Sequence, residues 1–262
     1  AGIDVPNYVA YIAEGKYREA VELIRERNPF PAICGRICHH PCEYKCRRGE
    51  LDDPVAIRAL KRLAADWYFS HVEKDPEPFP LRYNQRVAVV GAGPAGLSCA
   101  FYLRRMGYHA TVFEALPVGG GMMGVVIPDF RLPKEIIQRE IRYIEARGVE
   151  INYNSPITSQ RNVENLLKEG FNAVFIAAGA QRSQQLGIPG ELEGIEGIIY
   201  GLSFLRDVKV GKSVQVGRRA AVIGGGNTSM DAARTARRLE AQEVHVYYRR
   251  TQEEMPVTVR EY

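Results

Sequence analysis

A glycine-rich turn between an apolar run and a helical pattern constrains the fold of this chain more than any other feature. Residues 87–91 read VAVVG, and the turn is Gly91-Ala92-Gly93-Pro94-Ala95-Gly96. A short apolar run is typical of a buried parallel strand. In a GxGxxG run the glycines allow the tight turn, the approach of a pyrophosphate and close helix–strand packing. The following helix points free N–H groups at the phosphates.

An acidic residue after the next apolar run supports a dinucleotide site. Residues 110–114 read ATVFE, so Glu114 ends a second expected strand. A carboxylate there can accept hydrogen bonds from both ribose hydroxyls. A GxGxxG run alone is weak evidence, and a plain glycine turn with a solvated Glu is the alternative. The strand, turn, helix and acid together predict dinucleotide binding.

The same order of elements recurs later in the chain. Residues 220–225 read AAVIGG, a helix is expected from Thr228 to Leu239, and EVHVYY (243–248) is the next expected strand. The second turn is Gly224-Gly225-Gly226-Asn227-Thr228-Ser229, in which a small Ser takes the place of the third glycine. This internal duplication predicts two nucleotide-binding units.

The second unit differs from the first in the charge that follows its strand. Arg249 and Arg250 stand where the first unit has an acid. A carboxylate would repel a 2′-phosphate, whereas a guanidinium binds it in a bidentate manner. The sequence therefore favours NADP(H) over NAD(H), with a surface arginine pair as the alternative.

Two dinucleotide sites in one chain indicate electron transfer between their cofactors. Hydride passes directly between a flavin and a nicotinamide, so we expect one cofactor of each kind. That step needs no protein acid or nucleophile. We therefore expect no catalytic residue beyond those that position the cofactors and exclude water.

Four of the five cysteines form a compact run. Cys34, Cys38, Cys42 and Cys46 stand in three successive C-x3-C spacings. Such clustering is typical of metal or cluster ligation in a reducing compartment. A compact run of four favours an iron–sulfur cluster, whereas structural zinc sites favour two pairs set well apart. Zinc ligation and free or disulfide-bonded thiols stay open as alternatives.

The residues around these cysteines suggest an irregular loop. Gly35 and Pro41 are expected to break any helix and leave a loop that wraps a cluster. His39 and His40 could be ligands, although adjacent histidines in a loop are more often exposed. Cys99, in the helix after the first turn, is interpreted as a small buried residue.

These patterns predict an α/β protein with two Rossmann-like dinucleotide-binding units after a small helical iron–sulfur domain. We expect the helical domain at 1–80, a Pro- and charge-rich linker at 73–85, a first dinucleotide-binding domain at 84–187 and a second one at 188–262. The net charge of +4 is too small to indicate nucleic-acid binding. No apolar run of 18 residues or signal-peptide pattern is visible, so a cytoplasmic protein without a membrane span is expected.

Several longer runs together resemble one known family. They are NPFPAICGRIC-HHPCEYKCRRG, PVAIRALKR, VAVVGAGPAGLSCAFYL, VFEALPVGGGMMGVVIPDFRLPKEI, AAGA and VIGGGNTSMDAARTARR…YYRRTQEEMP. The chain resembles the glutamate synthase small-subunit family. That family includes the N-terminal half of dihydropyrimidine dehydrogenase and bifurcating ferredoxin:NADP oxidoreductases.

The resemblance implies FAD at the first unit and NAD(P)H at the second, so residues 84–187 are expected to be the first part of an FAD-binding domain and 188–262 an NAD(P)-binding domain. For FAD it implies Gly91 to Ala95, the segment from Glu114 through Gly120 and Gly121 to Met122, Arg131, Ile157, and the Ala178-Gly179 turn. For NADP it implies Gly225 to Thr228 and Arg249-Arg250.

The resemblance also implies two [4Fe-4S] clusters in the helical domain. On that pattern Cys38 and Cys42 serve one cluster and Cys46 the other. Lys61 stands where relatives often have a Gln or Glu ligand, and Cys34 is the expected substitute. The upstream cysteine motif of relatives is missing and the chain stops soon after the second turn, so we expect an internal part of a longer protein. Taken alone, the four cysteines would hold one cluster.

The expected function is an electron-input module. NADPH delivers hydride to FAD, and electrons leave singly through iron–sulfur clusters to a partner subunit that carries the substrate chemistry. A bifurcating ferredoxin:NAD(P) oxidoreductase subunit, or a subunit of another NAD(P)-linked complex, is the close alternative. A disulfide reductase would need a C-x-x-C pair near the second unit, but no cysteine follows Cys99. A non-catalytic assembly subunit and a zinc-binding interaction module are the other classes.

Overall fold

The computed structural model describes residues 2–256 and divides into two compact units. The first unit comprises residues 1–124 and 131–179, and the second comprises 125–130 and 180–262. Each is described by itself. The domain boundaries expected from the sequence stay predictions.

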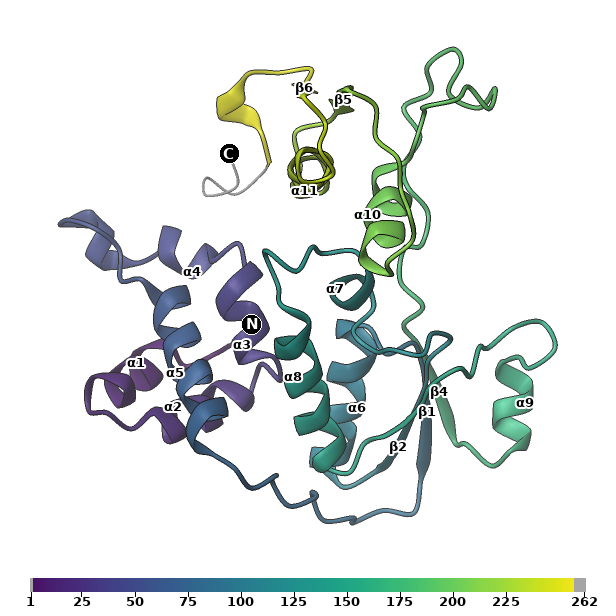
Figure 1. Ribbon diagram of the computed structural model, residues 1–262. Helices are drawn as coiled ribbons and strands as arrows, with labels where there is room; N and C mark the ends of the chain where they lie inside the picture. Colours follow the sequence, from purple (N-terminus) through teal and green to yellow (C-terminus); the bar gives the residue numbers. More distant parts are fainter. Residues whose placement is uncertain (1, 257–262) are drawn as a thin grey trace. The chain divides into compact units, whose positions relative to one another are not determined.

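The N-terminal part of the first unit is helical, as expected (Figure 1). Its elements are α1 (Val5–Ala13), α2 (Tyr17–Arg25), α3 (Pro31–Ile37), α4 (Pro41–Tyr44), η1 (Arg47–Glu50) and α5 (Ile57–His71). Their shared core consists of apolar side chains spaced three and four residues apart, which places them on one helix face. The fully buried members include Tyr8, Ala20, Val21, Ile24 and Ala64.

Gly35 does not break a helix, which corrects the expectation of a loop around the cysteines. It lies inside α3, with Cys34 beside it. A Cβ at Gly35 would come within 2.8 Å of the Cα of Arg62 on α5. The glycine therefore allows two helix backbones to approach closely. Pro41 opens α4 at its first position, where a proline has no N–H to leave unpaired.

A parallel sheet forms the rest of the first unit. Its strands are β1 (Arg86–Val90), β2 (His109–Phe113), β3 (Glu150–Asn152) and β4 (Ala173–Ile176), in the order β3-β2-β1-β4. Every pair is parallel, with Val87 opposite Ala110 on one side and Ala173 on the other. The intervening helices are α6 (Pro94–Met106), α7 (Met122–Val125), α8 (Lys134–Ala146) and α9 (Val163–Lys168).

Helices cover both faces of this sheet (Figure 1). Ala88 faces α9, because it packs with Phe113, Leu166 and Phe171. Successive strand residues point to opposite faces, so Val89 faces α6. The element order and the parallel pairing are those of a Rossmann-like α/β fold.

A buried ion pair joins the helical region to the sheet helices. Arg25 on α2 donates to the carboxylate of Glu140 on α8 at 3.2 Å, and both side chains are buried. The guanidinium also lies 3.4 Å from the ring centroid of Tyr143. The backbone N–H of Ala32, at the start of α3, donates to Glu140 at 2.6 Å. One carboxylate thus connects three helices.

The second unit repeats the strand–turn–helix–strand order. It contains α10 (Gly201–Lys209), β5 (Arg219–Ile223), α11 (Asn227–Arg238), β6 (Glu243–Tyr247) and η2 (Gln252–Glu254). Strands β5 and β6 pair in parallel. Residues 125–130 belong to this unit, since Phe130 lies under the guanidinium groups of Arg234 and Arg238.

None of the helices within residues 2–256 combines the length and the apolar character needed to cross a membrane.

Candidate cofactor-binding site

The first glycine turn lies at the carboxyl end of β1. Gly91 has φ +102°, and a Cβ there would lie 2.5 Å from the carbonyl oxygen of Ala177. A Cβ at Gly96 would lie 1.9 Å from the carbonyl oxygen of Gly91. Both positions therefore require glycine, as the motif predicted. Gly93 caps α6 in an extended conformation, and a Cβ there would meet only Gly121, at 3.8 Å. The turn is open on that side.

Glu114 is buried behind this turn. The backbone N–H groups of Ala92 and Leu116 donate to its carboxylate at 2.7 and 2.9 Å. Only 7% of Glu114 is exposed. The expected ribose-binding acid is therefore also a structural acceptor, since it fixes the turn after β1 against the end of β2. The sequence pattern did not indicate that Glu114 accepts backbone hydrogen bonds.

A second glycine loop lies against the first turn. The N–H of Gly120 donates to the carbonyl of Ala92 at 2.7 Å, and a Cβ at Gly121 would lie 2.8 Å from the Cα of Gly93. Met122 begins α7 directly afterwards. The run Gly119-Gly120-Gly121 is thus in contact with the turn. Its glycine content was the sequence signal for this close approach.

The other positions that the resemblance implied for FAD differ in their neighbours and in how deeply they are buried. Ala178 follows β4 and lies beside Gly91, because a Cβ on Gly91 would come within 3.5 Å of its Cα. Gly179, the second residue of this turn, has φ +72°. Ile157 is partly buried and packs on the cluster around Phe113 and Leu166. Arg131 is partly buried at the start of the segment that leads to α8.

The second turn has the same backbone form. Gly224 has φ +128°, and a Cβ there would meet the hydroxyl of Ser229 at 2.5 Å. A Cβ on Gly225 would meet the ring of Tyr248 at 2.7 Å. Gly226 caps α11 and has open space beside it, with Asn227 and Thr228 opening the helix.

The arginine pair after β6 makes no ion pair among the residues that the structure describes. Arg249 and Arg250 are exposed. No carboxylate within residues 2–256 lies at ion-pair distance from either guanidinium. Their positive charge is therefore not neutralised inside the described part of the chain.

The four clustered cysteines lie on three consecutive elements. Cys34 is in α3 and Cys38 at its C-terminus, Cys42 is in α4, and Cys46 precedes η1. All four are free and partly buried. Within residues 2–256, no three Cys, His, Asp or Glu side chains are grouped closely enough to hold a metal ion.

The environments of these thiols differ. Backbone hydrogen bonds from Val55, Arg48 and Gly49 lower the pKa of the Cys46 thiol. Several N–H donors around one sulfur favour its thiolate, which is the form that ligates iron. Burial raises the pKa of the Cys34 thiol, whose sulfur lies 3.6 Å from the amide oxygen of Asn28.

Neighbouring polar groups hold this region together. The N–H of His40 donates to the sulfur of Cys38 at 3.3 Å, and His40 adopts φ +46°. Arg58 on α5 donates to the carbonyl of Cys38 at 2.9 Å. Lys61 is buried near Cys34, and its positive charge favours the Cys34 thiolate. Lys61 on α5 therefore lies close to α3, the helix that carries Cys34.

Comparison with known proteins identifies the family. The model of the pyridine nucleotide-disulphide oxidoreductase family matches residues 85–261. The chain belongs to this family. A second model, dihydropyrimidine dehydrogenase domain II with a 4Fe-4S cluster, matches residues 1–73. These two matches, together with the relatives below, confirm the family resemblance seen in the sequence.

Relatives cover the chain nearly end to end. It is 45% identical to the NADPH-Fe(3+) oxidoreductase subunit beta of Geobacter sulfurreducens, over 99% of this chain and 39% of that protein. It is 42% identical to the NADP(+)-dependent formate dehydrogenase subunit beta of Moorella thermoacetica, over 98% and 39%. It is 32% identical to the Escherichia coli glutamate synthase [NADPH] small chain, over 98% and 57%. The chain thus spans between about two fifths and three fifths of these relatives.

A solved structure supports the fold. Mycobacterium tuberculosis FprA in complex with NADPH is 24% identical, with a TM-score of 0.57 over 68% of this chain and 46% of that one. The two matched families together imply iron–sulfur and FAD/NAD(P) cofactors.

Proposed function

We propose that this chain is the part of an oxidoreductase subunit that accepts hydride from NADPH and passes single electrons to a partner subunit. When bound, FAD and a [4Fe-4S] cluster together supply the conversion of a hydride into single electrons. One observation carries the proposal: the cysteine run and the first dinucleotide turn belong to one compact unit, in which Glu140 of α8 accepts hydrogen bonds from Arg25 and from Ala32 of the helix that carries Cys34. The names of the relatives refer to a subunit beta and a small chain, which supports the existence of a partner subunit.

The first turn is the proposed FAD site. Gly91, Gly93 and Gly96 leave room for a pyrophosphate at the start of α6, and the side of Gly93 is open. Glu114 keeps unused lone pairs on its two carboxylate oxygens for ribose hydroxyls. We assign to the same site a set of further positions around the turn: Ala92, Pro94, Ala95, Gly120, Gly121, Met122, Arg131, Ile157, Ala178 and Gly179.

The second turn is the proposed NADP(H) site and completes a second Rossmann-like unit. Gly226 leaves open space at the start of α11 for a pyrophosphate, beside Gly224, Gly225, Asn227 and Thr228. Arg249 and Arg250 supply the charge for a 2′-phosphate. NADP(H) is therefore preferred to NAD(H) in this proposal.

Cys34, Cys38, Cys42 and Cys46 are the proposed ligands of iron–sulfur chemistry. Soft thiolates suit such clusters, and the donors around Cys46 fit the thiolate form. His39 and His40 are left out of the ligand set. Arg58 fixes the backbone at Cys38 through its hydrogen bond to the Cys38 carbonyl. Asn28 orients the Cys34 thiol, which donates to the Asn28 amide oxygen.

The experiment is a cofactor analysis of the protein purified without oxygen in its full natural length. We expect one FAD released on denaturation, with iron and acid-labile sulfide in about equal amounts and in multiples of about four. Cys38→Ala is expected to lower iron and sulfide and to retain FAD. A Cys99→Ala control is expected to retain all three. Stoichiometric zinc with no labile sulfide would contradict the cluster, and a protein without flavin would contradict the hydride path.

A further inference from the structure

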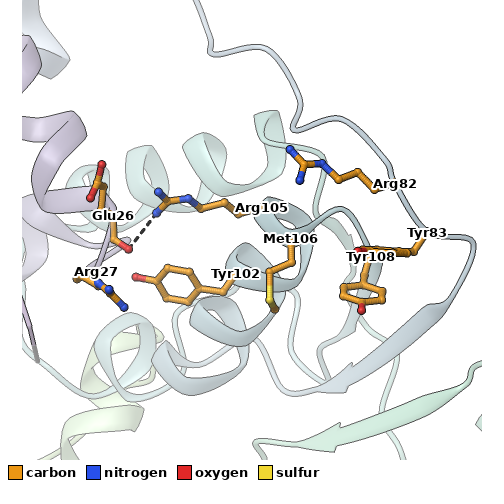
Figure 2. Close-up of a pocket in the computed structure, with 8 residues that line it drawn as sticks. All are labelled: Glu26, Arg27, Arg82, Tyr83, Tyr102, Arg105, Met106 and Tyr108. Atoms are coloured by element: carbon orange, nitrogen blue, oxygen red, sulfur yellow. Dashed lines mark hydrogen bonds between the residues drawn. The ribbon is translucent and has the colours of Figure 1, made fainter.

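A surface pocket in the first unit belongs to neither glycine turn nor the cysteine run. It lies where the end of α2, the segment before β1 and the end of α6 meet (Figure 2). Its volume is about 790 Å³. The lining residues are Glu26, Arg27, Arg82, Tyr83, Tyr102, Arg105, Met106 and Tyr108.

The pocket has an excess of positive charge, because three arginines and one acid, Glu26, line it. Arg27, Arg82 and Arg105 have no carboxylate at ion-pair distance within residues 2–256. Arg105 donates from Nη1 to the backbone carbonyl of Glu26 at 2.9 Å (Figure 2). That bond fixes the guanidinium and leaves its other N–H groups available. A fixed guanidinium binds a carboxylate with less loss of side-chain entropy than a mobile one.

An aromatic and thioether surface adjoins the arginines. The rings of Tyr83 and Tyr108 stack with their centroids 4.6 Å apart. Tyr83 is 46% exposed and Met106 is 51% exposed. The hydroxyl of Tyr102 is buried and makes no hydrogen bond within the described residues. Arginine, tyrosine and methionine are enriched in the centres of protein interfaces.

The backbone beneath the pocket is well fixed. The N–H groups of Arg82 and Tyr83 donate to the carbonyl of Gly107 at 2.9 and 3.1 Å. A Cβ on Gly107 would come within 2.7 Å of the Arg82 side chain, and its φ is +99°. These bonds fix the segment before β1 against the end of α6 before any ligand binds. This reduces the entropy cost of ordering the pocket on binding.

We propose that this pocket docks an acidic segment of the partner polypeptide. Carboxylates of that segment pair with Arg82 and Arg105, and an apolar side chain covers Tyr83 and Met106. The inference rests on the proposed function, because that function supplies the partner. A protein segment is favoured over a small anion because the exposed apolar surface at Tyr83 and Met106 gives a small anion nothing to bind.

The first test is a binding titration against the partner that co-purifies with the full-length, cofactor-loaded protein. Arg82→Glu and Arg105→Glu should each weaken binding at least about tenfold and flatten its salt dependence. Arg142→Glu makes the same change of charge on an exposed position of α8 and should leave the dissociation constant unchanged. Thermal unfolding of each variant shows whether the fold is kept, and Arg82→Lys should restore most of the affinity.

Zero-length carbodiimide coupling is the second test. The variants Arg82→Lys and Arg105→Lys place an amine in the pocket, and each should couple to an Asp or Glu of the partner, identified by peptide mass spectrometry. Absence of a co-purifying partner, unchanged affinity in both charge-reversal variants, or no coupling from either position would overturn the proposal. Binding of inorganic pyrophosphate that only the pocket variants lose would assign the site to a small anion and overturn it as well.

Flavin reduction by NADPH separates this inference from the proposed function. If the parent protein fails to reduce its flavin, the proposed function fails, while the binding and coupling results still decide the pocket. If reduction proceeds and the arginine variants bind normally, the pocket proposal fails alone.

Discussion

At the scale of single residues, Glu114 illustrates how one side chain serves both fold and site. Its sequence position after β2 predicted a ribose acceptor, and its carboxylate also accepts two backbone N–H groups. The two hydrogen bonds explain why this carboxyl group can be buried. A carboxylate with two N–H donors has its charge compensated inside the protein.

Replacing this acid should therefore destabilise the protein even without a cofactor. Glu114→Ala leaves the buried N–H of Ala92 without its acceptor, which costs about 1–3 kcal/mol, whereas the N–H of the exposed Leu116 can bond to water. We expect a loss of about 1–3 kcal/mol in the free energy of unfolding, measured by denaturant titration of apoprotein. Glu73→Ala, at an exposed position, is the matched control. Equal stability of the two variants would contradict the structural role.

The arginine pair gives a prediction on cofactor choice. Arg249→Ala or Arg250→Ala should raise the KM for NADPH about ten- to hundredfold, since one charge-assisted contact is worth about 1.5–3 kcal/mol. The KM for NADH should stay within about twofold. Arg219→Ala, at the opposite end of β5 from the turn, is the control. A parallel rise for NADPH and NADH would contradict recognition of the 2′-phosphate.

At the scale of elements, the approach of α3 to α5 depends on Gly35. Gly35→Ala puts a Cβ 2.8 Å from the Arg62 backbone, so the helices must separate. Overpacking of this kind costs about 1–3 kcal/mol. We expect lower thermal stability and less bound iron. Gly49→Ala, whose Cβ would lie 3.7 Å from Pro54, should change neither. Iron content equal to that of the parent would show that the helix contact does not position the cysteines.

The ion pair between α2 and α8 gives a second prediction at this scale. Arg25→Met leaves Glu140 charged and buried, which costs about 3–5 kcal/mol. The double variant with Glu140→Leu should recover part of that loss, since the buried charge is gone.

The pH dependence of this variant follows from the same burial. Burial already raises the pKa of Glu140, and Arg25 opposes that rise. Without Arg25 the folded-state pKa is higher still, so the folded protein binds a proton that the unfolded chain releases above its ordinary pKa. The stability of Arg25→Met should thus increase as the pH falls from 8 towards about 5. A flat profile would contradict a folded-state pKa of Glu140 that is raised in this variant.

The contacts between distant elements explain which parts of the fold could be predicted. Gly91, Gly107 and Gly224 all adopt positive φ, and their turns follow from local sequence alone. Glu140 contacts Arg25 across 115 residues of sequence, and no local pattern encodes such a pairing. Gly35 was misread for the same reason, because its neighbour is a helix that begins 22 residues later. The run of cysteines was found from spacing, whereas the donors around Cys46 depend on the folded loop.

At the scale of the whole molecule, two glycine turns of the same form, one cysteine run and one arginine pair occur in a single chain. Each of the two units folds around its own turn. The proposed electron path uses all of these parts, so it is tested on the full-length, cofactor-loaded protein.

An anaerobic titration of that protein with NADPH, followed by NADH on a fresh sample, tests the proposed electron path most directly. We predict that NADPH bleaches the flavin absorption and then the broad iron–sulfur absorption, and that NADH acts far more slowly. A yellow-brown protein whose spectrum neither nucleotide changes would contradict it.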